Sequence, residues 1–293
     1  MEACRTSERP QTDSSGSSAR SPLIREGSLV IVRGAGDLAT GVIVRLSRSG
    51  FRVVALETDR PTAIRRTVAF SEAVYDGRAV VEGMEARLVR DAAEVCAALE
   101  DGAVPVAVDP GAALVARLKP VAVVDAILAK RNLGTHRGMA GIVIALGPGF
   151  TAGVDADAIV ETSRGHDLGR VILEGSALPD TGVPGEIGGK SAERVVHARA
   201  AGIVVGVRAI GDLVRSGETI LAIEGEKGRL DVPSPLDGML RGLIRPGLRV
   251  AEGDKIADVD PRGQAACCRT ISDKARSVAG GVLEALLYLE NRR

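Results

Sequence analysis

Aromatic side chains are scarce in this chain of 293 residues, which has no Trp, two Tyr and three Phe. Stacking platforms for single-stranded nucleic acid rely on such side chains, so we do not expect one here. Net charge is also missing, because 38 Lys and Arg balance 38 Asp and Glu. This zero balance argues against a nucleic-acid partner held by bulk electrostatic attraction.

Long apolar runs and metal-binding motifs are absent from the sequence as well. The longest apolar runs, such as 142–146, cover about five residues, whereas a membrane-spanning helix needs about 20. The chain does not begin like a signal peptide, and its four cysteines include no CxxC pair. Its three histidines show neither HxH nor HExxH spacing, so we predict no metal site. Together these features favour a cytoplasmic protein that does not bind membranes.

Glycine, by contrast, is abundant, with 36 residues in a chain that is 45% hydrophobic. This combination predicts a packed protein with many tight turns. Residues 1–27 are rich in Ser, Thr, Gly and Arg without apolar periodicity, and we expect them to be a disordered tail. Over residues 28–135, short apolar runs alternate with helical periodicity, which is typical of parallel strands covered by helices on both faces. We therefore expect residues 28–135 to be a Rossmann-like nucleotide-binding domain.

The second half of the chain has a different pattern. We expect residues 136–197 to be a glycine-rich strand and loop segment, and residues 263–293 to form a C-terminal helix that docks on the protein or forms a dimer seam. Residues 198–262 contain an internal repeat, whose copies either interlock into a barrel-sandwich hybrid module or form a plain duplicated meander. Four glycines recur 36 positions later in the repeat: Gly202 and Gly238, Gly206 and Gly242, Gly211 and Gly247, Gly217 and Gly253.

The predicted fold class is therefore α/β. A Rossmann-like parallel-sheet domain comes first, a glycine-rich middle segment and a small β barrel-sandwich module follow, and a helix ends the chain. In open sheets of this kind, ligands bind outside the carboxyl ends of the strands. Candidate binding residues are accordingly sought in the loops that follow the predicted strands.

The first candidate site is the turn 34–39, which has the form GxGxxA between a predicted strand and a helix. Gly34 and Gly36 would let the backbone approach a pyrophosphate, and the helix N-terminus would supply amide donors. Glu57, at the end of the next strand, is placed to bond ribose hydroxyls. Asp37 puts a negative charge beside the proposed phosphate, and the same turn can also serve close packing of helix on strand. Nucleotide binding and a structural turn both remain open.

A second glycine turn, residues 146–153, follows a predicted buried strand. The amides of Gly147 and Gly149 can form an anion-binding concavity, to which Thr151 would add a hydroxyl. The alternative is a wide turn without a ligand.

The loop 161–170 gathers charged side chains and a histidine. Arg164 and Arg170 suit bidentate contacts with phosphate, and His166 could move protons near neutral pH. A histidine in a loop is often only a structural hydrogen-bonding group, so this interpretation is also open.

Basic residues also follow the predicted strand that ends at Asp125, in the stretches 130–132 and 136–137. They would suit an anionic ligand at the carboxyl end of the sheet, or they form a solvated loop. The pair Arg65 and Arg66 is a weaker candidate of the same kind. The adjacent thiols Cys267 and Cys268 are either structural or handle sulfur, because thiolate reactivity depends on local charge.

Several longer strings resemble a known family. They are RGAGDLATG (33–41), AIRRTVAFSEAVY (63–75), KRNLGT (130–135), LGPGFTAG (146–153), RGHDLGRV (164–171) and ISDKAR (271–276). The family is the YqeB-type family of selenium-dependent molybdenum hydroxylase accessory proteins, and the resemblance covers residues from about 28 to 290. It implies a maturation or cofactor-handling role, with a molybdenum hydroxylase as client and a dinucleotide or molybdopterin-type cofactor as ligand. It carries over no catalytic residues.

The repeat region also resembles a biotinyl or lipoyl carrier domain, in which Lys227 would occupy the modified position of the central hairpin. Glu226 and Gly228 stand where biotin acceptors have methionines, so the resemblance favours docking over attachment of a prosthetic group. The favoured function is an accessory factor that binds a nucleotide- or pterin-bearing anionic cofactor. The alternatives are an NAD(P)-dependent oxidoreductase, with His166 as acid and Lys130 as helper, and a non-catalytic scaffold.

Overall fold

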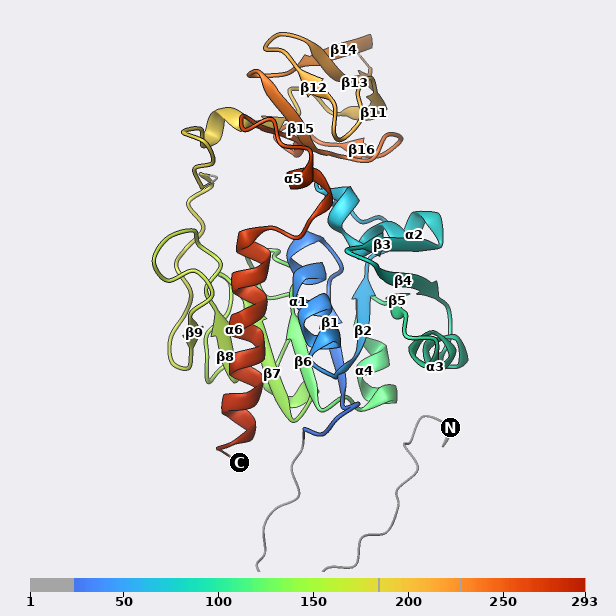
Figure 1. Cartoon of the computed structure of the whole chain (residues 1–293), viewed down its shortest axis with the longest axis vertical. Coiled ribbons are helices and arrows are strands. Elements are labelled where there is room, and N and C mark those ends of the chain that lie inside the picture. The colour runs from blue at the N-terminus through green and yellow to red at the C-terminus, as the bar shows by residue number, and fades with distance from the viewer. Residues whose placement is uncertain (1–23, 184, 227, 293) are drawn as a thin grey trace, which may run out of the picture.

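The computed structural model describes residues 24–183, 185–226 and 228–292, and most of the predicted tail lies outside these ranges. The chain builds a large sheet covered by helices and, beyond one end of it, a smaller all-β unit (Figure 1). We call the smaller unit, residues 195–260, the β module. Its strands form two further sheets of four strands each.

The large sheet has nine strands in the order β3-β4-β5-β2-β1-β6-β7-β8-β9. All neighbours from β4 to β8 are parallel, while β3 and β9 pair antiparallel at the two edges. The strands are β1 (Leu29–Arg33), β2 (Arg52–Glu57), β3 (Arg78–Val81), β4 (Met84–Val89), β5 (Val104–Val108), β6 (Ala122–Asp125), β7 (Ile142–Leu146), β8 (Ala158–Val160) and β9 (Val171–Ile172).

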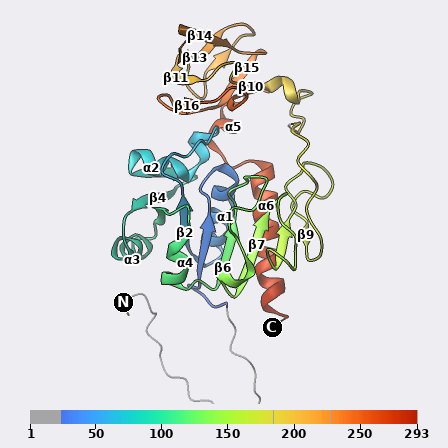
Figure 2. The ribbon, with the colours of Figure 1, turned by 180° about the vertical axis from the view of Figure 1, so that it is seen from behind.

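Helices cover both faces of this sheet, which is why its central strands are unbroken runs of Val, Ile and Ala. Helices α1 (Asp37–Arg48) and α6 (Asp273–Glu290) pack on the face that Val30 and Val32 present. Helices α3 (Ala92–Glu100) and α4 (Ala113–Leu118) cover the opposite face, which Ile31 presents. Figure 2 shows the molecule from this opposite side. The short helices are α2 (Ala73–Asp76), α5 (Ala266–Arg269), and the 3-10 turns η1 (Arg66–Val68), η2 (Phe70–Glu72), η3 (Arg137–Met139) and η4 (Ala192–Arg194).

This sheet corrects the predicted fold class. A Rossmann-like parallel sheet followed by a separate glycine-rich segment is wrong, because the sheet is mixed and the segment supplies β7, β8 and β9 to it. The final helix belongs to the same layer, since α6 packs beside α1. Strands β9 and β8 have only two and three residues, and so short a run shows no alternation that could be recognised in a sequence.

The β module is built from the internal repeat. Its strands are β10 (Val195–His197), β11 (Gly202–Gly206), β12 (Leu213–Val214), β13 (Thr219–Gly225), β14 (Gly228–Pro233), β15 (Gly238–Leu243), β16 (Arg249–Val250) and β17 (Lys255–Asp260). The short strand of each copy pairs with the other copy, β12 with β15 and β16 with β11. Each copy therefore contributes a strand that pairs with the other copy, and the two copies share one apolar core. The strand pairing does not test a carrier function, because Lys227, the residue that would be modified, lies outside the described residues.

Close backbone approach explains one pair of repeated glycines. A Cβ at Gly202 would lie 2.5 Å from the carbonyl oxygen of Glu224, and a Cβ at Gly238 would lie 2.5 Å from that of Asp260. The glycine and the carbonyl group that it faces in the first copy are therefore both repeated 36 positions later in the second copy. No larger residue fits at either position without displacing the neighbouring strand.

The β module is fixed to the segment between β2 and β3 by backbone and side-chain contacts. The amide of Leu243 donates to the carbonyl of Ile64 at 2.8 Å, and Arg66 Nε donates to the carbonyl of Leu243 at 2.7 Å. Arg245 binds Asp76 with both of its terminal nitrogens, at 2.6 and 2.9 Å. These contacts hold the module beyond the carboxyl ends of the parallel strands (Figure 1).

Candidate functional site

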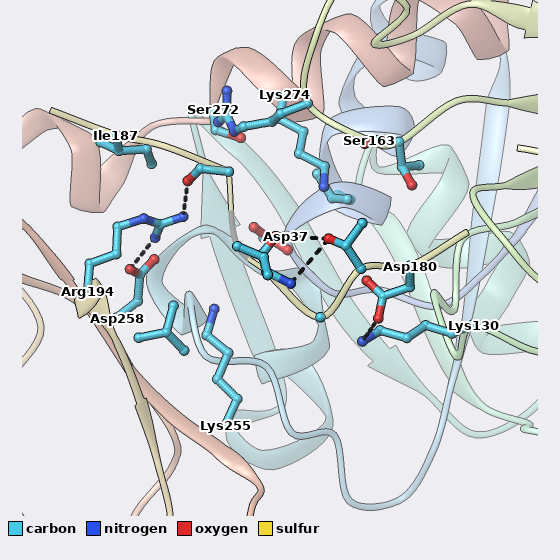
Figure 3. A pocket seen from close by; sticks show the side chains of 18 of the residues that line it. Asp37, Lys130, Ser163, Asp180, Ile187, Arg194, Lys255, Asp258, Ser272 and Lys274 are labelled. Atoms are coloured by element: carbon cyan, nitrogen blue, oxygen red, sulfur yellow. Dashed lines mark hydrogen bonds and ion pairs between the residues drawn. The ribbon is translucent and has the colours of Figure 1, made fainter. Parts of the chain in front are cut away.

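A cavity of about 430 Å³ lies between the carboxyl ends of the central strands and the β module (Figure 3). The loops that follow β1, β6, β7 and β8 line one side, with Asp37, Lys130, Pro148 and Ser163. Strands β10, β15 and β17 of the module line the other side. The stretch 178–183, which connects sheet and module, forms part of the wall.

Positive charge dominates this cavity, because basic side chains outnumber acidic ones seven to three among the residues that line it. The basic residues come from both sides, and the acidic ones are Asp37, Asp180 and Asp258. A walled site with an excess of one sign of charge concentrates ligands of the opposite sign. The basic residues are Arg65, Lys130, Arg164, Arg194, Arg241, Lys255 and Lys274.

Two helices begin at the cavity. Helices α1 and α6 pack side by side, so closely that a Cβ at Gly41 would lie 2.8 Å from that of Ala275, and the first residues of both line the cavity. Ser272 caps α6 by accepting the amide of Ala275, whereas Gly36 at the start of α1 offers no side-chain cap. The positive ends of both helix dipoles therefore add to the field of the basic side chains.

Buried ion pairs stabilise the module side of the cavity. The Asp258 carboxylate accepts a hydrogen bond of 2.6 Å from Arg194 and lies 3.8 Å from Arg241. Arg194 also donates to the carbonyl of Gly185 at 3.0 Å. Burial, together with repulsion by Arg65, lowers the pKa of Arg241. These guanidinium groups thus have structural partners and shape the wall.

Arg65 and Arg164 hold the sheet side in a similar way. Arg65 donates to the carbonyls of Cys267 and Thr270 at 3.0 and 3.1 Å, and lies 3.4 Å from Asp37. Arg164 binds Asp273 with two hydrogen bonds of 2.8 Å, which hold the pKa of that carboxyl far below its usual range. Both arginines line the cavity, and both guanidinium groups are already bonded to protein groups.

Lys274 differs from these arginines. Within the described residues its ammonium group makes no ion pair or hydrogen bond, and it points into the cavity from the first turn of α6 (Figure 3). Burial lowers its pKa, and the nearby cations Arg164 and Lys255 act in the same direction. The carboxylates of Asp37 and Glu161 oppose the shift.

Lys255 approaches the same space from the first residue of β17. Its side chain is exposed and lines the cavity, and partial desolvation by the surrounding protein lowers its pKa. Asp258 and Asp37 oppose this shift, while Arg194 and Arg241 reinforce it. Figure 3 shows Asp37 between the two lysines. Lys130, the third cavity lysine, is instead paired with Asp180 at 2.6 Å.

The first predicted glycine turn is closed largely by protein groups. The amide of Ala35 donates to the Glu57 carboxylate at 2.8 Å, which also accepts the amide of Thr58, so Glu57 holds the turn itself. Burial raises the pKa of Glu57, against the effect of these two amides. A Cβ at Gly34 would lie 2.8 Å from the carbonyl of Ala126, which explains that glycine by packing. Of this motif, Asp37 and Leu38 line the cavity.

The second glycine turn has the same character. Gly147 adopts φ +72° against Thr162, and Gly149 adopts φ +104°, where a Cβ would lie 2.7 Å from the backbone nitrogen of Arg131. The amide of Thr151 donates to Asp155 at 2.8 Å, and its hydroxyl lies 3.2 Å from that of Ser176. Only Pro148 of this turn lines the cavity, so its glycines position a wall.

The loop 161–170 is divided between two surfaces. Arg164 lines the cavity, whereas His166 is exposed and lies outside the set of lining residues. Arg170 pairs with Asp167 at 3.3 Å beside a different, shallower pocket. Among the residues singled out in the sequence, the structure thus brings Asp37, Arg164, Lys130 and the weaker candidate Arg65 together at the cavity. The glycines of the two turns, Glu57, Thr151, His166 and Arg170 do not line it.

Other sequence candidates have structural partners. Arg137 binds Asp157 at 2.8 Å, and the Asn132 amide donates to the carbonyl of Thr135. Cys268 is buried, which raises its pKa, and Cys267 lies beside it on α5. Within the described ranges, no group of His, Cys, Asp and Glu could hold a metal ion. No helix in that part of the chain combines the length and hydropathy needed to cross a bilayer.

The sequence did not reveal the cavity residues Arg194, Arg241 and Lys255. Each is an isolated basic residue, separated from the glycine motifs by long stretches of chain. Lys274 was present in the string 271–276 but had no assigned role. The sequence holds one signal for a site here: Lys255 lies at the start of a strand and Lys274 at the start of a helix.

Comparison with known proteins supports the similarity to YqeB-type proteins. The chain is 53% identical, over 261 residues, to a protein of Escherichia coli strain K12 described as uncharacterized protein YqeB. The match covers 89% of this chain and 48% of that protein, so the chain spans about half the length of this relative. No family model matches the sequence.

Among solved structures, one match is a succinylglutamate desuccinylase/aspartoacylase from Rhodobacter sphaeroides, at 16% identity and TM-score 0.27, covering 80% of this chain and 85% of that one. Another is the ectoine utilization protein EutE (DoeB) from Ruegeria pomeroyi, at 11% identity and TM-score 0.25, with the same coverage. The TM-scores of these matches are too low to indicate a fold, an activity or a substrate.

Proposed function

We propose that this chain binds a phosphate-bearing anionic cofactor, of the nucleotide or pterin class, in the cavity between the large sheet and the β module. The observation that supports this most directly is the pair Lys255 and Lys274, two ammonium groups without ion-pair partners among the described residues, beside the starts of α1 and α6. Like charges that share a cavity repel each other, so this pair is suited to an anionic ligand that neutralises it.

The size and chemistry of the cavity fit this class of ligand. Its volume of about 430 Å³ lies within the usual range for small-molecule sites. The basic side chains and the hydroxyl groups of Ser163 and Ser272 supply donors for phosphate oxygens. Leu38, Pro148 and Leu178 offer apolar contact for a ring. A role in maturing a molybdenum hydroxylase rests on the similarity to YqeB-type proteins, and it makes the cofactor the cargo of an accessory factor.

Removing either lysine charge is expected to weaken binding. A charged hydrogen bond contributes roughly 1.5–3 kcal/mol, so Lys255→Gln and Lys274→Gln should each raise the dissociation constant about 10- to 100-fold. Calorimetry with NAD and with a molybdopterin nucleotide measures this. Lys119→Gln, which removes an exposed lysine far from the cavity, is the control and should bind like the unmodified protein. If the unmodified protein takes up neither compound, the proposed function is wrong.

The affinity should also fall as pH rises. Only a charged ammonium attracts phosphate, and both lysine pKa values lie below the ordinary 10.5, so the loss begins at lower pH than for free lysine. NAD is a suitable ligand, since its phosphodiesters do not titrate in this range. Calorimetry from neutral to alkaline pH would test this, with the double variant K255Q/K274Q expected to show little pH dependence. An equal pH dependence in that variant would assign the effect to other groups.

A further inference from the structure

Lysine is rare in this protein, which makes its placement informative. The chain has six lysines against 32 arginines, and three of the six, Lys130, Lys255 and Lys274, line this one cavity. Arginine binds phosphate at least as well and stays charged at every accessible pH. A property that only lysine has, the ability to lose its proton and become a nucleophilic amine, would explain this placement.

Lys274 occupies the position best suited to that chemistry. It lies in the first turn of an 18-residue helix, where the helix dipole disfavours a cation. The cation Arg164, which binds the adjacent Asp273, and Lys255 from the module side are among its neighbours, and it makes no ion pair within the described residues. Desolvation and nearby cationic groups are the environment that activates lysine nucleophiles in proteins.

Asp37 provides a proton acceptor beside this amine. It lies at the start of α1, between Lys255 and Lys274 in Figure 3, and its ion pair with Arg65 is a long one at 3.4 Å. Asp180 and Asp258, the other cavity carboxylates, are each engaged with a basic side chain at 2.6 Å. Asp37 is therefore the carboxylate that is most available to exchange protons with a bound ligand.

We propose that Lys274 forms an imine with an anionic aldehyde or ketone bound in the cavity, a further activity that rests on the anion site proposed above. The neutral amine attacks the carbonyl carbon, and the π electrons of the carbonyl move to its oxygen. Asp37 carries a proton from the nitrogen to that oxygen. The oxygen then leaves as water with both amine protons, a C=N bond replaces C=O, and no oxidant or reductant is needed. Lys255 holds the anionic group of the ligand.

The test uses pyridoxal 5′-phosphate as an anionic aldehyde probe, with borohydride to reduce any imine and peptide mass spectrometry to locate it. We expect labelling of Lys274 to exceed that of the exposed Lys119 by about tenfold or more, because the basic cavity concentrates the anionic probe beside the Lys274 amine. Inorganic phosphate should suppress this labelling by competition. Labelling of Lys119 should not respond to phosphate.

Variants locate the covalent step. Lys274→Arg removes the nucleophilic amine, so it should lose the cavity label, while Lys119→Arg should keep it. If the unmodified protein binds the probe and Lys274 is labelled no more than Lys119, the imine proposal is overturned while the anion site stands. If neither phosphate nor the probe binds, both proposals fail.

Discussion

Replacing Gly281 by alanine is expected to destabilise the protein by about 3 kcal/mol, because it forces a methyl group into the close contact of α6 with β8 and the loop that follows it. A Cβ at Gly281 would overlap the carbonyl oxygen of Gly169 and lie 2.8 Å from the side chain of Val160 on β8. The opposite side is equally tight, since a Cβ at Gly169 would lie 2.7 Å from the carbonyl of Ser277. Neither partner can retreat without moving α6 away from the sheet. Urea unfolding measures the loss directly.

The adjacent glycine offers a matched control. Gly280 is also inside α6, but a Cβ there would have no atom within 4 Å. Gly280→Ala should therefore leave stability unchanged or raise it by up to about 1 kcal/mol, because alanine has the higher helix propensity. Equal effects of the two substitutions would show that the close approach at Gly281 does not limit the packing of α6.

Removing the Asp258 carboxylate is expected to lower the free energy of unfolding by an amount similar to that of Gly281→Ala. Asp258→Asn keeps the shape of the side chain but leaves Arg194, now bonded at 2.6 Å, and Arg241, at 3.8 Å, without their shared counter-charge. All three side chains are buried, and removing one partner of a buried ion pair costs about 3–5 kcal/mol. The measured quantity is again the free energy of unfolding.

An exposed ion pair in the same module provides the comparison. Asp231 lies 3.0 Å from Arg229 on the hairpin strand β14, with more than half of its side chain exposed. Asp231→Asn should change stability by no more than about 0.5 kcal/mol, since solvent screens such a pair. If Asp258→Asn were as mild as Asp231→Asn, the buried network would not be what holds the module wall of the cavity.

Long, continuous patterns were predictable from the sequence, and short or distant ones were not. The strand at residues 142–146 and the helix that Ser272 caps were both visible as apolar runs or stripes. The antiparallel edge strands β3 and β9 were not visible. They are short and partly exposed, so apolar and polar residues do not alternate clearly along them in the sequence. That omission is why the fold class was wrong.

The candidate site shows the same division. The glycine turns were found because glycine marks unusual backbone geometry, but a sequence does not tell whether a freed amide faces a ligand or a side chain such as Glu57. Lys255 and Lys274 come from two units of the fold and meet only in three dimensions. A site assembled from single residues on distant elements has no local spacing to detect.

The packing of α6 against α1 has a consequence for synthesis of the protein. Strand β9 ends at Ile172, and α6 begins at Asp273, so the whole β module is translated between the last strand of the large sheet and one of its covering helices. Until α6 leaves the ribosome, the apolar residues of α1 and β7 that it covers stay open to water or to other chains. The nascent protein therefore passes through a stage with a complete sheet and an unprotected face, which is the surface that a chaperone would recognise.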